Sequence, residues 1–154
     1  MSPTPLQLEH YFFTRVHSEA NPEFAATEGG MPEQQNVDAG IKVEVFKHED
    51  DPHRYQLTLT LDKVTAKEGV LPYNLDIQVV GFFLVDPDLK HDNINKLVQV
   101  NGASMLYTAA REHVLMVTGR GPWGPFQLPT VNFHLAVSQH EVKNEKVPAT
   151  GKQK

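Results

Sequence analysis

The stretch Tyr55-Gln56-Leu57-Thr58-Leu59-Thr60-Leu61-Asp62 decides the fold class of this chain. Apolar and polar side chains alternate through it, which is typical of a strand that buries one face. A polar turn at residues 48–53 precedes it, and before that turn Ile41, Val43 and Val45 alternate with Lys42, Glu44 and Phe46. Two alternating stretches on either side of a short polar turn predict a β-hairpin.

The same alternation recurs on both sides of this hairpin. Leu6, Leu8, His10 and Phe12 lie on one side of a first predicted strand, and Leu75, Ile77 and Val79 begin a last one after a tight link at residues 67–72. Residues 20–40 are rich in Gly, Pro, Glu and Gln, and connect the first strand to the hairpin. We therefore expect a four-stranded antiparallel sheet with a long crossover after its first strand.

Helical periodicity replaces the alternation after residues 86–88. Asp92 is a candidate N-cap for a short helix, and apolar residues at three- and four-residue steps predict a longer helix from Ala103 to Thr118, ended by Gly119. A further short helix is predicted over residues 131–139. Strands followed by helices predict an α+β fold.

The chain is long enough for one domain, which we place at residues 1–140. Residues 141–154 consist mainly of Lys, Glu, Gln, Pro and Gly, so we expect a disordered polar tail. No leader-like N-terminus or bilayer-length apolar run is visible, and the chain has no Cys. These features predict a cytoplasmic protein that is not inserted into a membrane.

Charge and motif content argue against several classes of function. The net charge is −5, from 14 Lys and Arg against 19 Asp and Glu, and no basic cluster indicates nucleic-acid binding. His48 and His53 flank an acidic turn, but the spacing of the eight histidines predicts no metal site. No nucleophile, phosphate or dinucleotide motif is present, so we expect a non-enzyme without a cofactor. An enzyme using His113 or Arg111 in a buried site remains a rival hypothesis.

Several apolar side chains fall in predicted loops. Trp123 and Phe126 lie in a proline-framed loop, and Phe24 and Met31 lie in the long crossover. Such residues either fill the domain's own core or contact a partner.

The second half of the chain resembles the SecB family of export chaperones. The matching residues are Ala110-Arg111-Glu112, Met116-Val117, Gly121, Trp123, Leu128 and Val131-Asn132-Phe133. The resemblance implies C-terminal helices packed on one face of the sheet and a homotetramer built as a dimer of dimers. It also implies an ATP-independent chaperone (holdase) that binds non-native polypeptides along hydrophobic grooves.

The resemblance also implies client-binding positions. In the family, the second strand and the C-terminal loop and helix line the peptide path, and the crossover contributes a tryptophan that has no counterpart here. In the crossover, Phe24 and Met31 could substitute for the tryptophan. The full set of implied client-binding positions is Phe24, Met31, Ile41, Val43, Val45, Trp123, Phe126, Leu128, Val131 and Phe133.

This sequence departs from the family pattern in two features that concern SecA, the partner to which the family delivers its clients. The family binds the motor SecA through an acidic patch, of which Glu19 and Asp76 match, whereas Arg15 stands where the family has an acid. The tail after His140 has four Lys against two Glu. The expected clients are thus either unfolded preproteins, exported through SecA, or an antitoxin in a toxin–antitoxin system. A small-molecule binder that uses the same apolar residues as a closed pocket is the alternative from another class.

Overall fold

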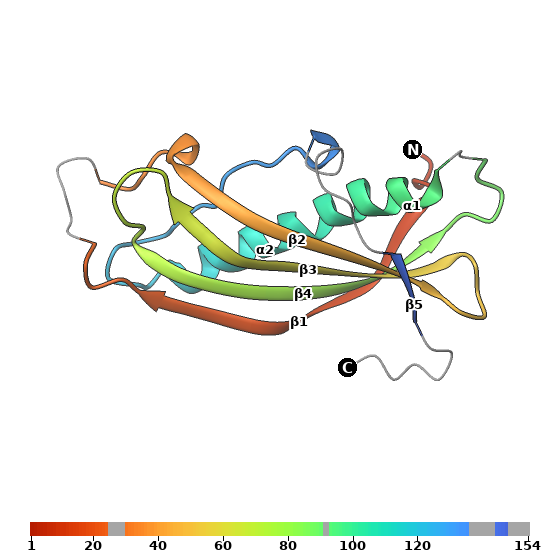
Figure 1. Ribbon diagram of the computed structural model, residues 1–154, viewed down its shortest axis with the longest axis horizontal. Coiled ribbons are helices and arrows are strands. Elements are labelled where there is room, and N and C mark those ends of the chain that lie inside the picture. Colours follow the sequence, from red (N-terminus) through yellow and green to blue (C-terminus); the bar gives the residue numbers. More distant parts are fainter. Residues whose placement is uncertain (25–29, 91–92, 136–143, 148–154) are drawn as a thin grey trace.

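The computed structural model describes residues 1–24, 30–90, 93–135 and 144–147 and contains one sheet (Figure 1). Its strands, in the spatial order β1-β4-β3-β2-β5, are β1 (Leu6–Ala20), β4 (Tyr73–Val85), β3 (Arg54–Ala66), β2 (Val37–His48) and β5 (Asn144–Val147). The first four pair antiparallel, which confirms the predicted sheet and hairpin. The described part of the long connection between β1 and β2 includes a short 3₁₀ turn, η1 (Gln34–Asn36).

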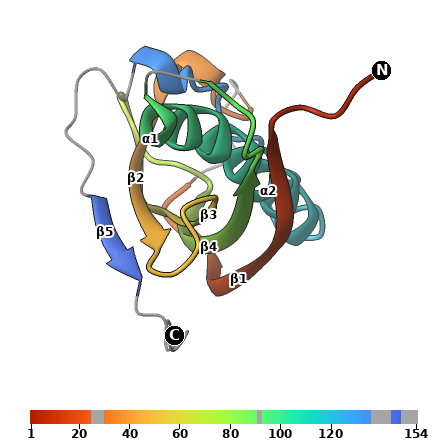
Figure 2. The same cartoon turned by 90° about the vertical axis from the view of Figure 1, so that its right-hand side faces the viewer.

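The fifth strand was not expected. β5 pairs parallel to β2, with Asn144 beside Val45 and Val147 beside His48. It lies in the segment 141–154, which the sequence predicts to be a disordered tail; residues 141–143 and 148–154 lie outside the described part of the chain. Seen end-on, β5 lies at the margin of the sheet beyond β2 (Figure 2).

β1 is longer than the alternation in the sequence indicates. Its pairing with β4 shifts register twice, between Leu8 and His10 and between Phe13 and Arg15. Each β-bulge inserts an extra residue and so changes which side chains share a face. The strand therefore continues to Ala20, although the period of two is interrupted along it.

The helices follow the sheet in the chain. α1 (Ile94–Leu97) leads through one turn of π-helix, η2 (Val98–Gly102), into α2 (Ala103–Thr118), whose bounds match the prediction. The N-cap of α1 is Asn93, whose side-chain oxygen accepts a hydrogen bond from the Lys96 backbone N–H at 2.9 Å. Asp92, the predicted cap, lies outside the described residues. Of the helix predicted over residues 131–139, the described part begins at Phe133 and extends to Leu135.

The core lies between the sheet and α2, which runs along one face of the sheet (Figures 1 and 2). Leu57, Leu59 and Leu61 are completely buried there, as their alternation predicts. Gly81 lets the helix approach the sheet closely, because a Cβ at this position would lie 2.8 Å from the Leu106 side chain. The inner face of the sheet therefore packs tightly against α2. This packing fixes the positions of the residues at the surface around it.

Candidate functional site

The ten residues predicted to contact a client fall into two groups in the structure. Five are buried in the subunit's own core, namely Phe24, Val45, Phe126, Leu128 and Phe133. Five pack against that core but remain partly exposed, namely Met31, Ile41, Val43, Trp123 and Val131. The buried group fills the core of this chain, whereas the other five keep part of their surface accessible. We call the half-buried group the apolar stripe.

Two residues of the apolar stripe, Ile41 and Val43, belong to β2 and lie at the margin of the core between the sheet and α2. Ile41 pairs with Leu61 and Val43 with Leu59, and both leucines are completely buried. Side chains of paired residues share a face of the sheet, so Ile41 and Val43 face the side covered by α2. They keep part of their surface exposed because β2 lies near the edge of the sheet, whereas β3 lies in its middle.

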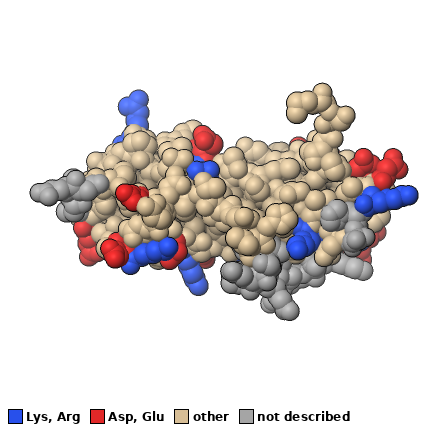
Figure 3. Space-filling model, turned by 90° about the horizontal axis from the view of Figure 1, so that it is seen from above, with Lys and Arg blue, Asp and Glu red and all other residues tan. Residues whose placement is uncertain are grey.

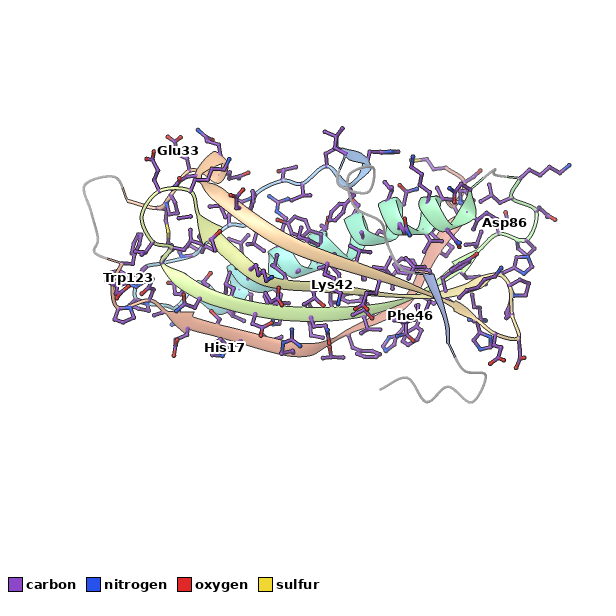
Figure 4. The ribbon with its side chains drawn as sticks, in the orientation of Figure 1. His17, Glu33, Lys42, Phe46, Asp86 and Trp123 are labelled. Atoms are coloured by element: carbon purple, nitrogen blue, oxygen red, sulfur yellow. The ribbon has the colours of Figure 1, made fainter. Side chains whose placement is uncertain are left out.

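The neighbouring side chains of β2 point the other way. Lys42 and Phe46 extend from the face of the sheet opposite α2 (Figure 4). Seen from above, charged residues are fewer in the middle of the molecule than towards its two ends (Figure 3).

The loop after α2 is held in place by Tyr73 of β4. The Tyr73 hydroxyl donates to the Gly124 carbonyl oxygen at 2.7 Å and accepts from the Trp123 backbone N–H at 3.1 Å. Gly121 allows this approach, since a Cβ there would lie 2.7 Å from Tyr73 Cε1. The loop is therefore fixed against the sheet and presents Trp123 in a defined position.

Trp123 also connects this loop to the crossover. Its indole Nε1–H donates to the Asn21 carbonyl oxygen at 3.1 Å. The Phe24 ring packs edge-on against the indole, with ring centroids 5.3 Å apart. Two segments that are about a hundred residues apart in sequence therefore meet at one end of the sheet, where Figure 4 labels Trp123.

The helix α2 holds the rest of the loop through three side chains. Thr118 Oγ1 accepts from the Phe126 backbone N–H at 2.9 Å, Arg111 Nε donates to the Leu128 carbonyl oxygen at 3.1 Å, and the Tyr107 hydroxyl donates to the Pro129 carbonyl oxygen at 2.6 Å. Burial raises the pKa of Tyr107 to about 12. Arg111 thus anchors a loop, a structural role that the enzyme hypothesis did not include.

In the sequence, the only sign of these anchors is the presence of polar residues in apolar surroundings. Tyr73, Tyr107 and Thr118 are buried, and their hydroxyls bind backbone atoms of a loop 8 to 51 residues away. Buried hydroxyls require hydrogen-bond partners. That rule predicts that such partners exist, and only the structure shows that the partners belong to the loop that carries Trp123.

The predicted SecA-binding residues lie on the face of the sheet opposite α2. Asp76 of β4 is bound by Arg15 of β1, whose Nε and terminal nitrogen each lie 2.8 Å from Asp76 Oδ1. Glu19 is exposed, two residues along β1 from His17, which is the register partner of Asp76. One of the two matching carboxylates is therefore neutralised by the basic residue that departs from the family pattern.

The acidic turn between β2 and β3 uses its histidines locally. His48 Nδ1 accepts from the backbone N–H groups of Asp50 and Asp51 at 3.1 Å each. The His53 backbone N–H donates to Asp51, and this bond, with the nearby Arg54 guanidinium, lowers the pKa of the Asp51 carboxyl. Among the described residues, no three His, Cys, Asp or Glu side chains gather closely enough to hold a metal ion.

A pocket opens near this turn, at the other end of β2 from η1. Its lining includes Glu9, His48, Arg54 and Phe82, and Arg54 forms an ion pair with Glu9 there. None of the ten predicted client-binding residues contributes to it. The described helices include none long and apolar enough to cross a bilayer.

Comparison with known proteins agrees with this arrangement. The sequence profile of the family "SecB: Preprotein translocase subunit SecB" matches residues 9–144, which include every strand from β2 to β4 and both helices. The chain belongs to the SecB family. This membership confirms both the predicted fold and the predicted chaperone function.

Individual relatives are distant. The protein-export protein SecB of Acidithiobacillus ferrooxidans is 29% identical over 114 residues, which cover 73% of this chain and 75% of the relative. The protein-export protein SecB of Rhodopseudomonas palustris is 23% identical over 121 residues, covering 79% and 73%. Among solved structures, a Mycobacterium tuberculosis SecB-like chaperone in complex with a ChAD peptide from the HigA1 antitoxin has the same fold, with a TM-score of 0.55. It is 15% identical, and the match covers 82% of this chain and 91% of that one.

Proposed function

We propose that this chain is an ATP-independent holdase of the cytoplasm that binds extended, non-native polypeptides along the apolar stripe. The observation that carries the proposal is the partial exposure of all five stripe residues while they pack against the core. Apolar side chains that remain accessible on a firmly packed frame are suited to bind other apolar side chains. Catalysis is not part of this function, as in other SecB-family chaperones.

The physical basis is the burial of apolar surface. Each Å² of apolar surface removed from water contributes roughly 25 cal/mol, independently of the sequence that supplies it. The hydrogen bonds from Tyr73, Tyr107 and Trp123 fix the loop before a client arrives. A fixed surface loses little conformational entropy on binding, so more of the burial energy appears as affinity.

Clients of two kinds fit this surface, namely unfolded preproteins for delivery to SecA and an antitoxin. The Arg15–Asp76 ion pair favours the second, because it removes one of the two free carboxylates that would bind SecA. We infer that SecA binding is weak in this protein and that the clients reach their destination without depending on that patch.

We also propose that the chain forms a homotetramer, built as a dimer of dimers. Apolar side chains stay exposed on the side where β1 and α2 meet, with Tyr11, Val16 and Met116 exposed by 43%, 42% and 68%. The Phe13 ring stacks on His113 at 4.4 Å and connects the two elements. Exposed apolar patches on soluble proteins mark interfaces, and closed symmetric assemblies are the common result.

A direct test maps the contact between the chaperone and a client. A photo-crosslinking amino acid at Val43 should capture a permanently unfolded protein such as reduced, carboxymethylated α-lactalbumin. The same group at Lys42, on the opposite face of β2, should capture much less. Equal capture at both positions would contradict the assignment of the stripe, and failure of the chain to suppress aggregation of any unfolded protein would contradict the function.

A further inference from the structure

The outer edge of β2 is occupied over only part of its length. β2 comprises 12 residues, and β5 pairs with four of them, Val45–His48. Within the described part of the chain, no strand pairs with Val37–Glu44 on that side. An open strand edge carries unpaired N–H and C=O groups that bind another extended backbone.

We propose that the edge of β2 is a docking site for an extended client backbone and that β5 occupies part of this site until a client displaces it. The inference rests on the holdase function proposed above and adds to it a main-chain mode of binding. The client would extend the sheet by one strand, as peptides do in other cases of strand addition.

The position of the edge relative to the stripe supports this mode. Ile41 and Val43 lie on β2 directly before the residues that β5 covers. A strand added along β2 would place every second side chain on the same face as Ile41 and Val43. A client with apolar residues at alternate positions would then form hydrogen bonds with the free backbone groups of β2 and, at the same time, cover the apolar stripe.

The properties of β5 suit a segment that can be displaced. It has only four residues, and its pairing with β2 is parallel, the slightly less stable arrangement. Asn, Glu and Lys, which form three of these four positions, are depleted in strands.

The covalent connection explains why so weak a strand is bound at all. A tethered segment competes at an effective concentration on the order of millimolar, without any gain in contacts. A longer client strand that also covers the stripe overcomes this competition. The polar β5 covers one part of the edge in the meantime, which limits edge-to-edge association between copies of the chain.

A reversible cross-link tests the proposal in the full-length protein. The chain has no Cys, so Lys47→Cys with Lys146→Cys introduces the only pair. Paired strands lie ~4.8 Å apart, within the Cα separation that a disulfide requires. Oxidation should fasten β5 to β2, and the same molecules after reduction are the matched control.

The measured quantity is the Kd for fluorescent, reduced and carboxymethylated α-lactalbumin, which contains no thiol to react. We expect the oxidised protein to bind at least about tenfold more weakly than the reduced protein, given the usual size of such tethering effects. The opposite change, Glu145→Pro with Lys146→Pro, removes backbone donors from β5 and should strengthen binding.

The possible outcomes distinguish the role of β5 from the holdase function. Equal binding by the oxidised and reduced proteins would overturn the role of β5 and leave the holdase function standing. Failure of the two Cys residues to form an intramolecular disulfide would also overturn it, because β5 would then not lie beside β2. If the unmodified chain does not bind the unfolded probe, the holdase function itself fails.

Discussion

The guanidinium of Arg15 holds the carboxylate of Asp76 at 2.8 Å across the β1–β4 pair. Both side chains are about two-fifths exposed, so this is a surface ion pair, which contributes at most about 1 kcal/mol to the free energy of unfolding. Its larger consequence is electrostatic, because it cancels the charge of one of the two acids that match the SecA-binding pattern.

Arg15→Glu should therefore strengthen binding to SecA while leaving the melting temperature nearly unchanged. The substitution frees Asp76 and adds a second carboxylate on the same face. Titration of purified SecA by calorimetry measures the effect. Lys42→Glu makes the same charge change on the same face but on β2, and should have the smaller effect. Strong SecA binding by the unmodified chain that Arg15→Glu weakens would refute our interpretation of this patch.

Val43→Glu should reduce suppression of aggregation several-fold, because it places a charge in the middle of the apolar stripe. Val43 is half-buried, so we also expect a modest loss of stability, about 1 kcal/mol. Lys42→Glu, one residue away on the opposite face, should retain activity. If activity and melting temperature fell together in both variants, or if Val43→Glu retained full activity, the stripe would not be the client site.

Gly121→Ala should destabilise the subunit by about 1–3 kcal/mol, the usual cost of excess volume in a packed region. The added methyl group would collide with the Tyr73 ring and so disturb the hydroxyl that holds Gly124 and Trp123. Denaturant unfolding measures the loss. Gly119→Ala is the control, since its Cβ would lie 3.2 Å from its nearest neighbour, and a larger loss there than at Gly121 would contradict this explanation.

The stability of the protein should decline between pH 10 and 12, and Tyr107→Phe should make this decline shallower. Burial raises the pKa of Tyr107 to about 12, whereas an unfolded tyrosine ionises near pH 10. Between these values the unfolded state loses a proton that the folded state keeps, so rising pH favours unfolding. Burial also raises the pKa of Tyr55, which leaves a residual decline in the variant.

Unfolding monitored by fluorescence at each pH measures this difference. At neutral pH, Tyr107→Phe should cost about 1 kcal/mol, because the Pro129 carbonyl oxygen loses its hydrogen bond. The exposed Tyr11→Phe serves as the control and should not change the slope. Identical slopes for the unmodified chain and Tyr107→Phe would contradict the assignment.

Val16→Glu with Met116→Glu should convert the proposed tetramer into smaller species, because both charges fall on the exposed apolar side of β1 and α2. Light scattering coupled to size exclusion measures the mass. His17→Glu, next along β1 but on the other face, should leave the assembly intact. A monomeric mass for the unmodified chain at micromolar concentration would argue against self-association.

Periodicity predicted the elements with a regularly repeating apolar side. β3 buries its alternating apolar residues from Tyr55 to Leu61, and α2 has a regular apolar side, so both were predicted from local pattern alone. β1 was predicted too short, since two bulges interrupt its alternation. β5 was missed because a polar strand at the edge of a sheet has no buried face to leave a pattern.

The burial of the individual client-binding candidates could not be predicted from the sequence, for a different reason. Val43 and Val45 follow the same alternation, yet one is half-buried and the other is 1% exposed. Similarly, Trp123 and Phe126 share one loop, but Phe126 turns into the core. Local sequence determines which face a side chain occupies, whereas the packing of distant segments determines whether that face is covered.

The close approach at Gly81 has a consequence for how this chain can change over evolutionary time. Every possible replacement adds at least a methyl group to a space already filled by the Leu106 and Phe83 side chains. A tolerated change at Gly81 therefore requires a compensating change on α2 or β4 in the same lineage. Positions of the apolar stripe have no such coupling on their exposed side and can vary one at a time, so client preference can diverge between relatives while the spacing of helix and sheet stays fixed.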